Sequence, residues 1–140
     1  MKESKMKVTY YRGLDNVDWD EMKTTLREDK FDNGRTVEQY QKSFENSYST
    51  CIAYLDKMII GTARTLSDGI GNAYIVDVWT LSEYRRKGIA RKMIETLLKE
   101  LPGQHVYLQT DSDTLEFYKK LGFKEQPYGV SIVVGEYLKS

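Results

Sequence analysis

The chain has 140 residues, 40% of them hydrophobic and 30% charged, which is enough to bury one core, so we expect a single domain over residues 1–140. Its 21 basic and 21 acidic residues cancel, which argues against a nucleic-acid partner because such proteins usually carry a basic excess. One cysteine and one histidine exclude an internal disulfide and offer no cluster of metal ligands.

Hydrophobic periodicity and turn residues predict strands and helices in a mixed order along the chain. The first part of the chain predicts a strand at 8–12 and two helices, one that begins at 18–21 and one that begins at Thr36 and ends near Asn46. Three strands follow, at 50–55, 58–66 and 73–81, and then a helix from Gly88 to Leu101. The last part predicts a strand at 105–109, a helix from Asp113 to Gly122, and last strands at 132–134 and 137–138. Helical crossovers join parallel neighbours, so we expect a mixed α/β domain whose sheet is parallel in part.

The segment Arg85-Arg86-Lys87-Gly88-Ile89-Ala90 is the most informative part of the chain. It lies between the apolar strand predicted at 73–81 and the clearest predicted helix. The free N–H groups of a first helical turn and the helix dipole both favour an anion. Three cationic side chains add to that field, and Gly88 permits close approach of a ligand. The segment is therefore typical of a phosphate-binding turn.

Two motifs together resemble the GCN5-related N-acetyltransferase (GNAT) superfamily. The first, Arg85-x-x-Gly88-x-Ala90, is similar to that family's acetyl-CoA loop, and the second, Phe117-Tyr118-Lys119-Lys120-Leu121-Gly122-Phe123, is similar to its late Tyr-x-x-x-Gly-Phe segment. The order of predicted elements also matches. The segments 61–69, 74–78 and 117–118 further resemble small bacterial members related to plastid serotonin or lysine acetyltransferases. The resemblance implies an acyl-CoA N-acyltransferase fold with a central mixed sheet of six or seven strands and about four helices.

The resemblance implies an acyltransferase that moves an acetyl group from the cosubstrate acetyl-CoA directly to a primary amine, either a small molecule or a lysine-type acceptor. A non-catalytic acetyl-CoA-binding or sensor module on the same fold is the alternative. Homodimers are common in this superfamily. The start of the chain, 1–7, has no apolar core, and no apolar run is long enough to span a bilayer, so we expect a cytoplasmic protein with no membrane partner.

The resemblance also implies a donor site with two parts. Backbone N–H groups of the basic loop would hold the pyrophosphate, and a main-chain N–H at the end of the strand at 73–81 would face the thioester oxygen. Asp111 stands where the family often has an Asn that contacts CoA; it can instead bond a pantetheine amide or cap the following helix. The predicted cofactor-binding residues are Val78, Trp79, Thr80, Arg85, Arg86, Lys87, Gly88, Ile89, Ala90, Arg91 and Asp111.

Two residues are candidates for proton transfer. Tyr118 matches the family's tyrosine, which gives a proton to the departing thiolate, and a phenol with pKa ~10 suits a thiol with pKa ~8.5. Asp77 is the only carboxylate of its predicted strand and is a candidate base or amine anchor. Strict alternation turns it away from Val78, unless a bulge re-aims it. A water chain without a dedicated base is the competing account.

Acceptor recognition is less evident in the sequence. Arg64 and Asp68 are polar residues near predicted turns, and both are candidate substrate-binding residues. Asp68 could attract a cationic amine, or it could serve only as an ordinary turn residue before Gly69.

Overall fold

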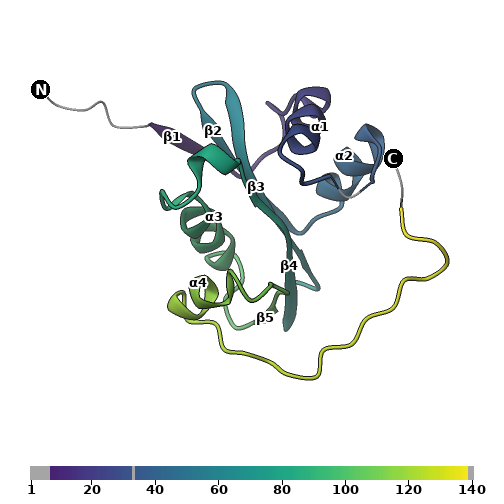
Figure 1. Cartoon of the computed structure of the whole chain (residues 1–140). Coiled ribbons are helices and arrows are strands. Elements are labelled where there is room, and N and C mark those ends of the chain that lie inside the picture. Colours follow the sequence, from purple (N-terminus) through teal and green to yellow (C-terminus); the bar gives the residue numbers. More distant parts are fainter. Residues whose placement is uncertain (1–6, 33, 139–140) are drawn as a thin grey trace, which may run out of the picture.

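The computed structural model describes residues 7–32 and 34–138, and it contains five strands and four α-helices (Figure 1). The strands are β1 (Val8–Tyr11), β2 (Ser49–Leu55), β3 (Met58–Ser67), β4 (Asn72–Thr80) and β5 (His105–Tyr107). The helices are α1 (Trp19–Glu28), α2 (Val37–Glu45), α3 (Ile89–Leu98) and α4 (Leu115–Lys120), with a short 3-10 turn at Ser82–Tyr84. The predicted mixed α/β class is confirmed.

The sheet has the strand order β1-β2-β3-β4-β5. The first four strands are antiparallel, and β5 is parallel to β4 because the α3 crossover connects them. The parallel pairing is short, from Asn72 opposite His105 to Tyr74 opposite Tyr107. Beyond this point β4 continues to Thr80 without β5 beside it, so the sheet opens at the C-terminal half of β4.

Helices cover both faces of the sheet and bury two separate cores. Figure 1 shows α3 and α4 on one side and α1 and α2 on the other. One core contains Ile75 and the α3 residues Ile89, Met93, Ile94 and Leu97. The other contains Trp79 with Met22, Leu26, Tyr40 and Phe44 of α1 and α2. β4 therefore contributes to both cores, and the groove described below opens along it.

Local sequence signals account for the helix boundaries. Asp18 accepts a hydrogen bond from the N–H of Glu21 at the start of α1, and Thr36 and Gln39 form a capping box at the start of α2. α3 begins after Gly88, whose left-handed backbone (φ 83°) only glycine adopts readily. It ends at Leu98, three residues before the predicted Leu101, and Leu101 is nonetheless buried.

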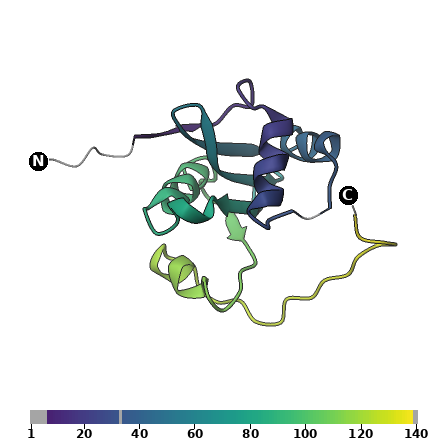
Figure 2. The ribbon, with the colours of Figure 1, turned by 45° about the horizontal axis from the view of Figure 1, so that its top comes forward.

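The prediction of last strands at 132–134 and 137–138 is wrong, and within residues 7–32 and 34–138 the sheet has five strands, not the expected six or seven. Residues 124–138 contain no strand, and Figures 1 and 2 show them as an extended arm that leaves the α/β body. Val130 and Val134 are 93% and 90% exposed. Apolar alternation favours a strand only where a neighbouring strand supplies hydrogen bonds, and this arm pairs with none.

Two further expectations concern membrane-spanning helices and the start of the chain. None of the helices within residues 7–32 and 34–138 has the length and apolar character needed to cross a membrane. The start of the chain at 1–6 lies outside the described residues, so the expectation drawn from its composition stays a prediction.

Candidate active site

A groove of about 860 Å³ follows the opening between β4 and β5. It is lined by residues 75–80 of β4, 84–86 and 88–91 of the basic loop and α3, 108–111, 113–114, 117–118 and Phe31. Every residue predicted to bind the donor or to transfer protons lies along this groove except Lys87. The separation of the two strands is what the sequence-based hypothesis requires, since an open strand edge leaves room for an extended ligand.

A β-bulge in β4 re-aims its side chains. Thr62 pairs with Trp79 and Arg64 with Val76, so two residues of β4, Asp77 and Val78, lie opposite one residue of β3. Asp77 has the left-handed φ of 53°. The bulge reverses the alternation: Ile75 and Val78, three residues apart, both pack against the α3 core. The structure therefore contains the bulge that the sequence analysis considered as a way to re-aim Asp77.

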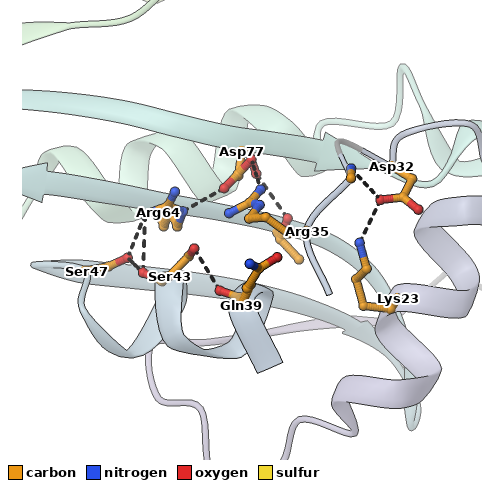
Figure 3. Close-up of polar contacts among 10 residues, drawn as sticks. Lys23, Asp32, Arg35, Gln39, Ser43, Ser47, Arg64 and Asp77 are labelled. Atoms are coloured by element: carbon orange, nitrogen blue, oxygen red, sulfur yellow. Dashed lines mark hydrogen bonds and ion pairs between the residues drawn. The ribbon is translucent and has the colours of Figure 1, made fainter. Parts of the chain in front are cut away.

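Asp77 forms ion pairs with two arginines on the α2 side of the sheet, the buried Arg35 and the partly buried Arg64 (Figure 3). Arg35 Nη2 donates to its Oδ1 at 2.8 Å, and Arg64 Nε donates to its Oδ2 at 2.7 Å. The exposed fractions of the Asp77, Arg35 and Arg64 side chains are 13%, 6% and 12%. Both carboxylate oxygens are thus engaged with guanidinium groups, so Asp77 serves as the counter-charge of two arginines.

The basic loop combines exposed cations with a turn that leaves backbone N–H groups unused. Arg86 and Gly88 both have left-handed φ angles, of 63° and 83°. Lys92 is the residue whose N–H bonds to the Gly88 carbonyl, at 3.1 Å, so the N–H groups of residues 89–91 precede the helical hydrogen bonds. Arg86, Lys87 and Gly88 are exposed. The loop therefore presents N–H donors and positive charge to the groove.

Asp29, which sequence reasoning missed, attaches this loop to the end of α1. Its Oδ2 accepts the Trp79 indole N–H at 2.9 Å and the Ser82 backbone N–H at 3.2 Å, and Arg85 Nη2 lies 3.7 Å away. Burial alone would raise the pKa of Asp29, but the hydrogen bonds from Ser82 and Trp79 and the Arg85 charge lower it overall. No local sequence pattern predicts these contacts, because Trp79 is 50 residues from Asp29 in the chain.

Tyr118 lies at the α4 end of the groove. Its side chain is buried (8% exposed) and packs edge-on against Phe117 and Phe123, with ring centroids 4.9 and 5.7 Å apart. Burial and then the nearby Asp111 charge raise the pKa of Tyr118 above 10.0, so its hydroxyl stays protonated at neutral pH. Tyr118 also lines a second cavity, of about 1240 Å³, between the sheet edge and the arm.

The Asp111 side chain holds the turn before α4 and does not cap the helix itself, whose N-cap residue is Thr114. Its Oδ1 accepts hydrogen bonds from the N–H groups of Asp113 and Thr114 and from the Thr114 hydroxyl. These contacts fix the turn before α4, which carries Tyr118. Among the described residues that line the groove, the remaining carboxylates are Asp77, which is ion-paired, and Asp113, which is exposed.

The two predicted acceptor-binding residues lie away from the groove. Arg64 contacts Asp77, the Ser43 carbonyl and the Ser47 hydroxyl, and it is not among the groove-lining residues. Asp68 accepts hydrogen bonds from the N–H groups of Ile70, Gly71 and Asn72, and these bonds lower its pKa. Asp68 is therefore placed as a turn residue of the β3–β4 hairpin, beside the second cavity.

Comparison with known proteins gives a consistent family. The model of the acetyltransferase (GNAT) family matches residues 14–123. GCN5-related N-acetyltransferase 2, chloroplastic, of Arabidopsis thaliana is 36% identical over 78 residues, which are 54% of this chain and 30% of that protein. Histone acetyltransferase TAP1 of Glycine max is 38% identical over 77 residues, 53% of this chain and 33% of that protein. The chain thus spans about a third of the length of these curated relatives.

Solved structures share the fold at low identity. A protein from Deinococcus radiodurans R1 superposes with a TM-score of 0.80 at 23% identity, covering 94% of this chain and 93% of that one. The GNAT-family protein SP0256 from Streptococcus pneumoniae TIGR4 gives a TM-score of 0.77 at 20% identity, covering 93% and 100%. These similarities show the fold over 93–94% of the chain; at 20–23% identity they show nothing about its chemistry.

Proposed function

The chain belongs to the acetyltransferase (GNAT) family, and we propose on that premise that it is an N-acetyltransferase that moves an acetyl group from acetyl-CoA directly to a primary amine. One observation carries the proposal: a single groove holds the basic loop before α3, the unpaired edge of β4 and the hydroxyl-bearing Tyr118. We further propose that residues 1–140 act as one domain, with a small amine or a lysine side chain as acceptor.

The loop residues fit a pyrophosphate. Backbone N–H groups of residues 89–91 and the guanidinium of Arg86 would bind its oxygens, because the helix N-terminus and the cationic side chain both favour a divalent anion. Gly88 suits this role, since nothing lies within 4 Å of the position that its Cβ would take. By binding the pyrophosphate, the loop would position acetyl-CoA so that its thioester lies beside β4.

The backbone of β4 fits the polarising role. The N–H of Val78 lies in the part of β4 that β5 no longer accompanies, and a donor there would stabilise the charge that develops on the thioester oxygen. As the amine nitrogen forms its bond to the carbonyl carbon, the C–S bond breaks and Tyr118 gives its phenolic proton to the leaving sulfur. A pKa above that of a thiol keeps this proton available at neutral pH.

The amine proton would leave through water. Asp77 is engaged by Arg35 and Arg64, and Asp111 accepts three hydrogen bonds at the turn before α4. We therefore favour the account without a dedicated base and assign Asp77 another role below.

Release of free thiol from acetyl-CoA tests the proposal. The protein is incubated with acetyl-CoA and a panel of polyamines, arylalkylamines, amino acids and lysine peptides, and acetylated product is identified by mass spectrometry. Amine-dependent release is expected for at least one class. Tight acetyl-CoA binding without turnover on any amine would replace the enzyme by the alternative, an acetyl-CoA-binding module.

A further inference from the structure

The side of β4 that faces away from α3 holds a buried ionic cluster formed by Arg35, Asp77 and Arg64 (Figure 3). We propose that this cluster positions the Asp77–Val78 peptide so that its N–H points into the groove. Asp77 is then a positioning residue and not the base. The inference rests on the proposed acetyl transfer, because it concerns the backbone donor that would polarise the thioester.

Three contacts hold Asp77 in a left-handed backbone conformation that aspartate rarely adopts. Non-glycine residues seldom adopt a φ of 53°, and they persist there where the surroundings determine it. The two arginines hold the carboxylate at 2.8 and 2.7 Å, and the Thr62 hydroxyl donates to the Asp77 carbonyl oxygen at 3.0 Å. Side chain and peptide are therefore both fixed at the bulge.

The carbonyl contact determines where the next N–H points. The peptide bond is trans, so its C=O and N–H groups point in opposite directions. The Asp77 carbonyl is directed at Thr62 of β3, and the Val78 N–H is consequently directed away from β3. That direction is the side on which β5 has separated from β4 and on which the groove opens.

The arginines tie this peptide to the helical layer on the far face of the sheet. Arg64 also donates to the Ser43 carbonyl and the Ser47 hydroxyl, each at 3.3 Å, and its guanidinium lies over the Phe44 ring. The Arg35 guanidinium lies 4.5 Å from the centre of the Tyr40 ring. Arg35 precedes α2 and Arg64 belongs to β3, but both contact α2, so movement of α2 would be transmitted to the Val78 N–H.

Infrared spectroscopy of bound acetyl-CoA tests this inference without knowledge of the acceptor. Acetyl-CoA labelled with ¹³C at the thioester carbonyl is bound to the full chain, and the carbonyl stretch is compared with that of the free compound. A hydrogen bond from Val78 lowers the frequency in the parent protein. In Asp77→Asn, which tolerates a positive φ but loses both ion pairs, most of this lowering should disappear. Acetyl-CoA affinity should stay within about threefold, because the pyrophosphate loop is untouched.

Two further variants sharpen the test. Arg64→Lys keeps a cation but loses the paired geometry of the guanidinium, and it should reduce the frequency shift partly. Glu100→Gln is the control: Glu100 forms an ion pair with Arg12 at 3.1 Å and does not line the groove, so the carbonyl frequency should stay at the parent value. With a reactive amine, turnover of Asp77→Asn should fall by about tenfold to a hundredfold at saturating donor.

The outcomes separate the two proposals. Failure of the parent chain to bind acetyl-CoA would overturn the proposed function and this inference with it. Normal binding and an unaltered carbonyl frequency in folded Asp77→Asn would overturn the positioning role alone. Should Asp77→Asn not fold, an unaltered frequency in Arg64→Lys has the same consequence.

Discussion

The Trp79 indole N–H donates a hydrogen bond to Asp29 Oδ2 at 2.9 Å, and this bond joins the end of β4 to the C-terminal end of α1. The same carboxylate accepts the N–H of Ser82, which begins the turn that leads to the basic loop. Asp29 thus links three parts of the molecule: the first helix, the second core through Trp79, and the approach to the groove. The stability of this junction depends on the charge state of one side chain.

Substitution of Asp29 by Asn should lower the free energy of unfolding by about 1–2 kcal/mol at pH 7, because the buried Trp79 indole N–H and the Ser82 N–H lose a charged acceptor. The pKa of Asp29 is lowered in the folded protein. Its contribution is therefore present above the unfolded pKa, near 3.8, and is lost as pH falls below that value. Urea unfolding of both proteins between pH 3 and 7 should give curves that converge at the acid end.

The exposed turn residue Asp56 provides the control for this experiment, since Asp56→Asn should leave the curve close to that of the parent. An equal difference between parent and Asp29→Asn at all pH values would show that the carboxylate charge is not what stabilises the junction.

Substitution of Tyr118 by Phe should reduce turnover by about a hundredfold or more and leave acetyl-CoA affinity within about threefold, because the hydroxyl acts only on the leaving sulfur. Rapid-mixing kinetics and calorimetric binding check the two quantities. Tyr107→Phe is a suitable control: Tyr107 bonds His105 and lines the second cavity, not the groove. Equal turnover in Tyr118→Phe and the parent would remove Tyr118 from the mechanism.

Substitution of Gly88 by Val should weaken acetyl-CoA binding by about tenfold, since a β-branched residue resists the left-handed φ of 83° and shifts the loop backbone. Gly103→Val is a matched control. Gly103 has a similar φ of 76°, and neither site has an atom within 4 Å of an added Cβ. Both variants should lose similar stability, and only Gly88→Val should bind acetyl-CoA more weakly. Equal affinities for the two would count against the loop.

Arg86 and Lys87 are adjacent exposed cations, but only Arg86 lines the groove. Arg86→Gln should therefore weaken acetyl-CoA binding by roughly threefold to tenfold, and Lys87→Gln by less than twofold. Affinity measured at several salt concentrations should show a shallower salt dependence for Arg86→Gln. A larger loss in Lys87→Gln would mean that the donor approaches the loop from the other side.

The elements that the sequence predicted well are those with local causes. Thr36 and Gln39 mark the start of α2 by the bonds that they exchange, and Gly88 marks the start of α3. The strand at 73–81 and the loop after it are also local patterns, and both line the groove between β4 and β5. Because these signals depend on neighbours in sequence, they can be found without the tertiary structure.

The features that the sequence did not predict are determined by distant partners. Asp77 was a candidate base because its own strand is apolar, but Arg35, 42 residues away, decides its environment. The contact of Arg64 with Asp77, 13 residues away, is likewise a tertiary one. The apolar residues of the arm favour strands locally, and the missing strand partner is a tertiary fact. Ion pairs and strand pairs between residues far apart in sequence cannot be predicted from the periodicity of hydrophobic residues.

The single extra residue in β4 also bears on how such a protein can diversify. Ile75 and Val78 pack toward α3, whereas Asp77 and Trp79 contact α1, α2 and the turn between them. Mutations on the α1–α2 side can therefore accumulate without altering the apolar contacts behind the donor groove. The bulge thus divides β4 into two sets of side chains that can change separately, apart from the Arg35–Asp77–Arg64 cluster that we infer positions the Val78 N–H.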